Sequence, residues 1–184
     1  MNRLEELKNV WRQPINYDDP KFASFIPYKE VNKIHGLIEF CEEFVTKDTV
    51  MIELGTGRGV STEVFAHFAK LVYTIDMRRW DDTTDKNISV YENIIPIVDN
   101  TYNTYSGFED NSIDLIYLDS DHEFNHVKKE LSLYRPKLKI TGICSGHDYQ
   151  EQANDVIKAV NEVFGKPDKV YKDSTWVVDL KNRR

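Results

Sequence analysis

Residues 49–62 read TVMIELGTGRGVST, and this stretch decides the fold class. TVMIEL is a short apolar run followed by Gly55, Gly57 and Gly59, a pattern typical of a buried parallel strand that turns into a helix. Glycine permits the sharp turn and lets the backbone approach a ligand beside the first amides of the helix. The helix is predicted at STEVFAHFA (61–69), with Ser61 as its N-cap.

The same alternation of strand and helix patterns continues along the chain. Further strand patterns are LVYTID (71–76), IIPIV (94–98), IDLIYLD (113–119) and ITGICSG (140–146). Helical spacing covers 31–45, 123–135 and 152–164, and KVYK with TWVVDL (169–180) reads as a hairpin. The sequence predicts an α/β fold with a doubly wound, mostly parallel sheet and helices on both faces. Residues 31–184 form the predicted domain, and residues 1–30 a separate N-terminal extension.

Composition narrows the function classes. The 184 residues suit one domain, and the net charge of −7 would repel a phosphate backbone, which argues against duplex nucleic acid as partner. No apolar run approaches 18 residues, so no membrane span is predicted. Cys41 and Cys144 lie in apolar segments and read as buried thiols, with a disulfide left open. The charged start MNRLEELKNVWRQP is unlike a signal peptide and predicts a cytoplasmic protein.

Acidic residues flank the glycines at the strand ends, where parallel α/β sheets bind ligands. Glu53 precedes Gly55 by two residues, and Asp76 ends the next strand pattern. An acid directly before the loop would repel a pyrophosphate but suits a cationic ligand with an amino group. Asp76 is placed to accept hydrogen bonds from two ribose hydroxyls.

Four segments resemble, in their order along the chain, the motifs of class I S-adenosylmethionine-dependent methyltransferases. They are IELGTGRG, the acid of YTIDM, PIVDN and GFEDNSIDLIYLD. The resemblance covers about residues 35–180 and implies a Rossmann-like sheet of seven strands whose final hairpin inserts one antiparallel strand. It implies that the methionine part of the cofactor lies at the glycine loop, the ribose at Asp76 and the adenine near Asp99 and Asn100. The full set of implied cofactor contacts is Glu53, Gly55, Thr56, Gly57, Gly59, Asp76, Met77, Asp99, Asn100 and Asp119.

A second group of polar residues follows the next two strand patterns. Asp119 and His122 follow one strand, and His147 with Asp148 end its predicted neighbour. Two carboxylates and an imidazole, Asp119, His147 and Asp148, are sufficient ligands for a divalent cation. Such an ion would acidify a substrate hydroxyl, and His122 would take the proton as general base.

This segment is similar to a branch of small-molecule O-methyltransferases that includes the macrolide-sugar enzymes. In that branch an aspartate and an acidic pair bind magnesium, and a histidine three residues after the aspartate is the base. Asp119 and His122 match that spacing, whereas His147 replaces an acid. The replacement weakens the case for Mg²⁺ and opens manganese, iron or zinc.

Purely structural roles for several of these residues stay open. His122 could be an exposed helix-start residue, His147 could bond only to backbone, and His126 is interpreted as a surface residue. Cys144 is interpreted as core. The aromatic residues before residue 30 (Trp11, Tyr17, Phe22, Phe25 and Tyr28), and Trp80 in the loop 77–87, could form a lid or pack on the sheet.

The leading hypothesis is a methyltransferase that acts on a small hydroxylated molecule. No [DNS]-P-P-[YFW] motif, typical of base-nitrogen methylation, occurs in the sequence. One alternative is a non-catalytic protein that binds S-adenosylmethionine or S-adenosylhomocysteine. Another is a metal-dependent oxygenase, against which the glycine loop argues. The oligomeric state stays open, with a homodimer as one option.

Overall fold

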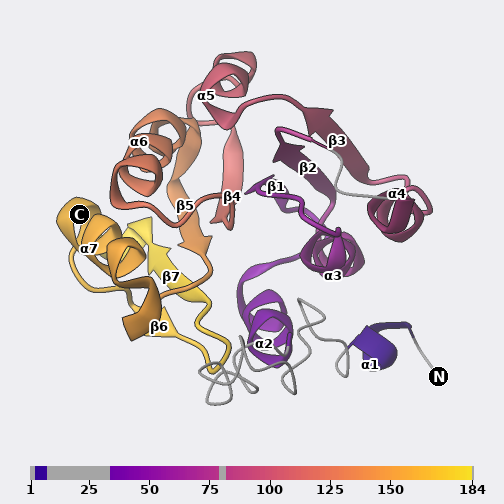
Figure 1. Ribbon diagram of the computed structural model, residues 1–184, viewed down its shortest axis with the longest axis horizontal. Coiled ribbons are helices and arrows are strands. Elements are labelled where there is room, and N and C mark those ends of the chain that lie inside the picture. Colours follow the sequence, from indigo (N-terminus) through magenta and orange to yellow (C-terminus); the bar gives the residue numbers. More distant parts are fainter. Residues whose placement is uncertain (1–2, 8–33, 79–81, 184) are drawn as a thin grey trace, which may run out of the picture.

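A seven-stranded sheet forms the centre of the molecule (Figure 1). The structure, a computed structural model, describes residues 3–7, 34–78 and 82–183. The strands lie in the order β3-β2-β1-β4-β5-β7-β6. They are β1 (Val50–Leu54), β2 (Leu71–Asp76), β3 (Ile94–Val98), β4 (Ile113–Leu118), β5 (Leu138–Gly146), β6 (Lys169–Val170) and β7 (Trp176–Asp179). The predicted sheet of seven strands is confirmed.

Strands β1 to β5 are parallel, and β7 inserts antiparallel between β5 and β6. The chain runs outward from β1 through β2 to β3, then returns to the other side of β1 with β4. The crevice between β1 and β4 is therefore the point at which the strand order reverses. Open α/β sheets bind ligands there, beyond the carboxyl ends of the strands.

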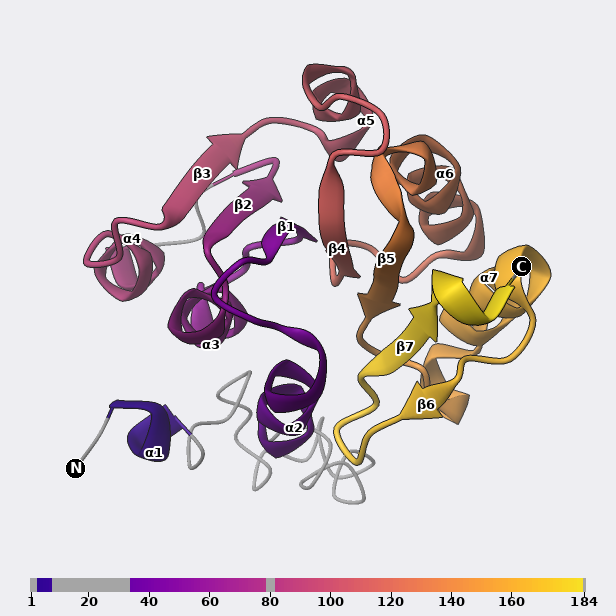
Figure 2. The ribbon, with the colours of Figure 1, turned by 180° about the vertical axis from the view of Figure 1, so that it is seen from behind.

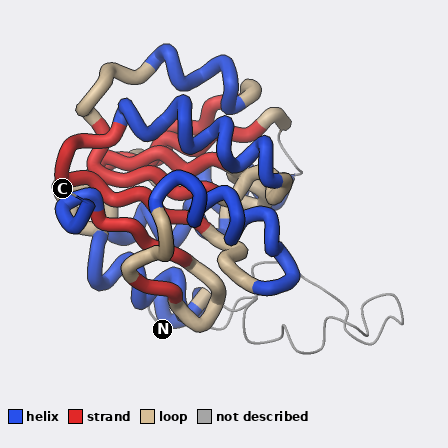
Figure 3. The backbone as a smooth tube through the Cα atoms, turned by 90° about the vertical axis from the view of Figure 1, so that its left-hand side faces the viewer, coloured by secondary structure: helices blue, strands red, loops and turns tan. Residues whose placement is uncertain are grey.

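Helices cover both faces of the sheet, as the two opposite views show (Figures 1 and 2). Helices α2 and α3 bury apolar side chains against one face, and α6 and α7 do so against the other. The side view shows the strands enclosed between helices (Figure 3). The helices are α1 (Arg3–Leu7), α2 (His35–Phe44), α3 (Val60–Phe68), α4 (Asp82–Ile88), α5 (Thr101–Thr104), α6 (Phe124–Tyr134) and α7 (Asn154–Phe164). Short 3-10 helices occupy Tyr105–Gly107, Arg135–Lys137, Glu151–Ala153 and Leu180–Arg183.

The two faces have separate hydrophobic cores because strand side chains alternate between them. On β1, Met51 packs with the α2 and α3 side, whereas Ile52 and Leu54 pack with the α6 and α7 side. Cys41 and Cys144 are buried and form no disulfide, as free thiols were expected to be. Among the described residues, no helix is long and apolar enough to cross a membrane.

Helix α3 begins earlier than the sequence indicated. Gly59 is its N-cap residue, with a φ of 76° and no capping side chain, and Ser61 is buried inside the first turn. The prediction that Ser61 caps the helix is therefore wrong. The glycine turn enters the helix directly, because glycine adopts the left-handed conformation at little cost.

The N-terminal extension is described only in part. In α1, Leu7 is buried in the core that includes α2 and α3, which fits the interpretation that this segment packs on the domain. The five aromatic residues expected there, from Trp11 to Tyr28, and Trp80 lie outside the described residues. Whether they form a lid stays a prediction. The interpretation of residues 77–87 as a loop is wrong from Asp82 onward, because Asp82–Ile88 form helix α4.

Candidate active site

The glycine loop (residues 55–59) connects β1 to α3 and is bonded to the neighbouring strand β2. The Gly55 N–H donates to the Ile75 carbonyl oxygen at 2.8 Å, and the Gly57 N–H donates to Asp76 Oδ2 at 3.0 Å. Gly55, Gly57 and Gly59 have φ values of 97°, 52° and 76°, which L side chains rarely adopt. The sequence pattern is thus explained by backbone conformation.

Gly55 also brings the glycine loop against the end of β4. A Cβ atom added to Gly55 would lie 2.1 Å from the Asp119 carbonyl oxygen, so only glycine fits between the two backbones. By contrast, a Cβ atom added to Gly57 would have no heavy atom within 4 Å. The space over Gly57 is therefore open to a ligand, whereas Gly55 sets how closely the two strand ends approach.

Glu53 lies beneath the glycine loop and is fully buried. Its Oε2 accepts hydrogen bonds from Thr62 Oγ1 at 2.5 Å and Thr74 Oγ1 at 2.7 Å. Its buried Oε1 accepts none from the residues that the structure describes. Burial, with a smaller effect of the Asp119 charge, raises the pKa of Glu53 to about 7, against the opposing effect of the Thr62, Thr74 and Ser61 hydroxyls. Glu53 is thus an acid poised between its neutral and charged forms, with one oxygen lacking a donor.

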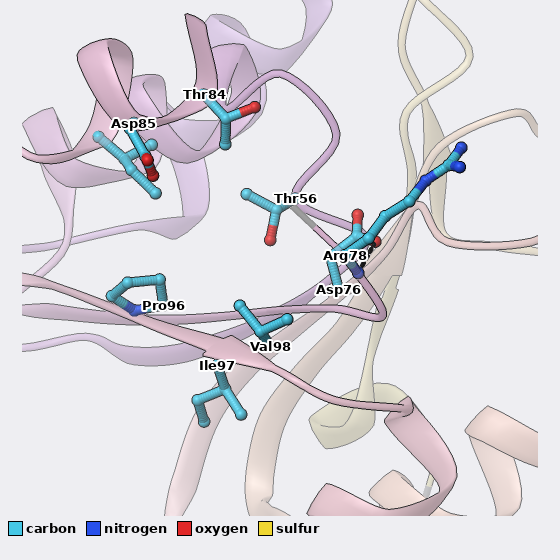
Figure 4. A pocket seen from close by; sticks show the side chains of 9 residues that line it. Thr56, Asp76, Arg78, Thr84, Asp85, Pro96, Ile97 and Val98 are labelled. Carbon is cyan, nitrogen blue, oxygen red and sulfur yellow. Dashed lines mark hydrogen bonds between the residues drawn. The ribbon is translucent and has the colours of Figure 1, made fainter. Parts of the chain in front are cut away.

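Asp76 borders a pocket between β3 and α4, seen from close by in Figure 4. Its Oδ1 also accepts a hydrogen bond from the Arg78 backbone N–H at 3.3 Å. The Thr56 hydroxyl is turned inward and shares a hydrogen bond of 2.7 Å with Thr74. The lining residues are Thr56, Asp76, Arg78, Thr84, Asp85, Ile88, Pro96, Ile97 and Val98.

The residues expected near an adenine ring lie at the ends of β2 and β3. Asn100 Nδ2 contacts Met77 Sδ at 3.8 Å, and the Asp99 N–H donates to the Asp76 carbonyl oxygen at 3.0 Å. The Met77 side chain is 70% exposed. The structure therefore brings the sequence-predicted cofactor residues to one edge of the sheet.

Four side chains form the Asp–His cluster (Asp119, His122, His147 and Asp148) beyond β4 and β5. His122 Nε2 lies 3.0 Å from Asp148 Oδ2 and 3.8 Å from Asp119 Oδ1. His147 Nδ1 lies 3.1 and 3.8 Å from the same two oxygens. Asp119, His122 and Asp148 each offer one donor atom within 4.8 Å of the others, a spacing that suits a metal ion.

The two histidines of the cluster differ in their surroundings. The His122 side chain is 48% exposed, whereas that of His147 is 8% exposed. His147 Nε2 lies 3.3 Å from the Ser174 hydroxyl, in the turn between β6 and β7, and the His147 carbonyl oxygen accepts from Trp176 Nε1. Asp148 has a φ of 61°, so its backbone is strained where it turns its carboxylate toward both rings.

The carboxylates and imidazoles of the Asp–His cluster shift one another's pKa values. Hydrogen bonds with Asp119 and then Asp148 raise the pKa of His122 to about 10. Burial opposes ionisation of Asp148, but the charge of His147 and the hydrogen bonds of His122 and His147 hold its pKa well below the usual range. The raised pKa favours the imidazolium form of His122, in which neither ring nitrogen has a lone pair to accept a proton.

A second polar group, which the sequence did not indicate, anchors the segment between Asp119 and His122. Glu130 on α6 is buried, and both its oxygens accept from the Ser120 hydroxyl at 2.8 Å. His126 Nε2 contacts Glu130 Oε1 at 3.0 Å, and the Tyr102 ring lies against His126, tilted by 33°, with centroids 4.8 Å apart. His126, interpreted from the sequence as a surface residue, is half-buried, with 24% of its side chain exposed, and it pairs with Glu130. A Glu four residues after His126 on one helix face was the available signal.

Comparisons with known proteins agree with this geometry. A family model described as a methyltransferase domain matches residues 52–149, more than half of the chain. The chain belongs to this family. The prediction of a class I S-adenosylmethionine-dependent methyltransferase is thus confirmed. Comparison with curated protein sequences gives no match.

Solved structures show how widely this fold is used. An rRNA methylase from Streptococcus thermophilus has a TM-score of 0.57 and 19% identity, over 69% of this chain and 77% of that one. The protein SMU.1697c from Streptococcus mutans, solved in complex with SAH, gives 0.56 and 18%, over 69% and 77%. An O-methyltransferase from Thermotoga maritima gives 0.54 and 16%, over 88% of this chain and 54% of that one. At sequence identities below 20%, these similarities show that the fold is shared; they do not show the substrate of this methyltransferase.

Proposed function

We propose that this methyltransferase transfers the methyl group of S-adenosylmethionine to a hydroxyl of a small molecule, assisted by a divalent ion at the Asp–His cluster. The observation that carries the proposal is the contact between the Gly55 and Asp119 backbones, which leaves no room for a Cβ atom. A cofactor over the glycine loop would consequently lie beside the carboxylates of the cluster. Close positioning of methyl donor and acceptor is a major source of rate enhancement.

The residues present fit the cofactor. The unpartnered Oε1 of Glu53 suits an amino group, and the positive charge of that group would favour the ionised carboxylate. Open space over Gly57 admits a ligand that the backbone can touch. Asp76, already oriented by the Gly57 N–H, has further acceptor capacity for ribose hydroxyls.

At the other side of the crevice, the Asp–His cluster suits an oxygen acceptor. Asp119, His147 and Asp148 would hold a divalent ion, which lowers the pKa of a bound hydroxyl. In the transfer a carbon–oxygen bond forms and the sulfur–carbon bond breaks, S-adenosylhomocysteine leaves, and the hydroxyl proton passes to solvent water. A net charge of −7 favours a small acceptor over RNA, although the fold is also that of an rRNA methylase.

The experiment has two stages. Isothermal titration with S-adenosylhomocysteine tests the cofactor, and absence of binding would refute the proposal at its first step. Transfer of labelled methyl groups to a panel of phenols and sugars is then compared with transfer to rRNA fragments, with and without chelator. We expect labelling of one hydroxylated class and its loss on chelation. Labelling of rRNA alone would contradict a small-molecule acceptor. Labelling that persists in the presence of chelator would contradict a role for the divalent ion.

A further inference from the structure

The geometry points to His122 as a ligand of the ion, in place of the general base that its spacing from Asp119 suggested. We infer that the Asp–His cluster is a site of two carboxylates and two imidazoles, and that it selects a transition-metal ion such as Mn²⁺, Fe²⁺, Co²⁺ or Zn²⁺ over Mg²⁺. This inference rests on the proposed function for its role in catalysis, but the ion can be tested independently of methyl transfer.

The distances among the donor atoms carry the first step. His122 Nε2 lies 3.0 Å from Asp148 Oδ2 and 3.8 Å from Asp119 Oδ1. Donor atoms about 2.0–2.2 Å from one ion lie roughly 3 Å apart at right angles and up to about 4.4 Å apart across the ion. The three donors lie within 4.8 Å of one another, so small adjustments suffice to bring them around a shared centre.

His147 is oriented as a metal-binding histidine. Its Nδ1 lies 3.1 and 3.8 Å from the oxygens of Asp148 and Asp119 that His122 also approaches. Its other nitrogen, Nε2, lies 3.3 Å from the buried Ser174 hydroxyl, which can accept a hydrogen bond from an Nε2–H. An ion would replace the hydrogen bond between Nδ1 and Asp148, and an Nε2–H donated to Ser174 would then let Nδ1 bind that ion. Such an outer partner is typical of metal-ligating histidine.

The composition of the donor set carries the second step. Two carboxylates and two neutral imidazoles balance the charge of one divalent ion. Mg²⁺ prefers oxygen donors and usually keeps several waters, whereas imidazole suits zinc, iron and other transition ions. Nε2 of His122 faces the two carboxylates, which is the position of a ligand, so a base role would fall to its other nitrogen, Nδ1. The substrate hydroxyl would then bind at an open position of the ion.

Co²⁺ is the probe because its visible absorption reports nitrogen and oxygen ligands directly. We expect chelator-treated protein to bind Co²⁺ with a visible band that Mg²⁺ in about a hundredfold excess does not displace. His122→Ala and His147→Ala should each weaken Co²⁺ binding at least about tenfold and alter the band. His35→Ala is the matched control, since His35 is exposed at the start of α2, and it should bind Co²⁺ as the wild type does.

Circular dichroism and titration with S-adenosylhomocysteine establish that each variant is folded. If His122→Ala binds Co²⁺ with the wild-type affinity and spectrum, His122 is not a ligand and the inference falls. Displacement of Co²⁺ by stoichiometric Mg²⁺ would overturn the ion class. Wild-type protein that binds no Co²⁺ yet transfers methyl groups would refute the inference and leave the proposed function standing. Co²⁺ binding by protein that binds no S-adenosylhomocysteine would refute the proposed function and leave this inference standing.

Discussion

The glycine loop and the Asp–His cluster lie at the same edge of the sheet but are built in different ways. In the glycine loop, positions within one short segment are fixed by backbone conformation, and Asp76 on the next strand completes the arrangement. In the Asp–His cluster, donors come from two strand ends, and their orientation depends on side chains elsewhere, Ser174 among them. The first region therefore tolerates few changes in its own sequence, whereas the second depends on distant supports.

The largest expected effect separates the two regions. Gly57→Val places a branched side chain in the open space over the glycine loop, at a φ of 52° that disfavours any β-branched residue. We expect S-adenosylhomocysteine affinity to fall by about a hundredfold or more, on the order of 2.7 kcal/mol, by isothermal titration. Co²⁺ absorption at the Asp–His cluster should be unchanged. Normal cofactor binding would mean that the loop is only a structural turn.

Asp76→Ala should have a smaller effect in the same region. The substitution removes the acceptors proposed for the ribose and the partner of the Gly57 N–H. A charge-assisted hydrogen bond contributes about 1.5–3 kcal/mol, so we expect roughly tenfold weaker S-adenosylhomocysteine binding or more. Asp85→Ala, on α4 at the same pocket, serves as the comparison. Wild-type affinity in a folded Asp76→Ala variant would contradict the ribose assignment.

Glu130→Gln tests whether the Asp–His cluster depends on distant support. The neutral amide keeps the shape of Glu130 but weakens its bonds to Ser120 and His126, which hold the segment between Asp119 and His122. We expect Co²⁺ affinity to fall about tenfold, at the lower end for outer partners of metal ligands. Cofactor affinity should stay within error. A similar loss of both affinities would indicate general destabilisation, which the midpoint of urea unfolding would reveal.

The smallest effect concerns pH at the glycine loop. Because the pKa of Glu53 is raised to about 7, its carboxyl is neutral below that pH and ionised above it. An amino group of the ligand pairs with the ionised form, so S-adenosylhomocysteine affinity should rise severalfold between about pH 6 and pH 8 and then level off. Glu53→Gln should remove this rise. A flat profile for the wild type would show that Glu53 does not contact the cofactor.

The order of strands and the glycine loop could be predicted because their causes are local. Continuous apolar runs mark strands buried on both faces, and glycines mark positions with positive φ. The one error there, Ser61 as N-cap, arose because Gly59 itself enters the helix. Local preference for serine at a cap was overridden by the tight turn that the loop requires.

For the Asp–His cluster, the sequence by itself determined the location, since Asp119, His147 and Asp148 end strands that the topology makes neighbours. Only the tertiary structure decided which atoms meet. It placed His122 between both carboxylates, Ser174 behind His147, and the buried Glu130 beneath Ser120. The partners are 10 to 27 residues apart for these last two contacts. Sequence spacing carries no direction for a side chain across such separations, whereas packing of the β6–β7 turn and of α6 fixes it.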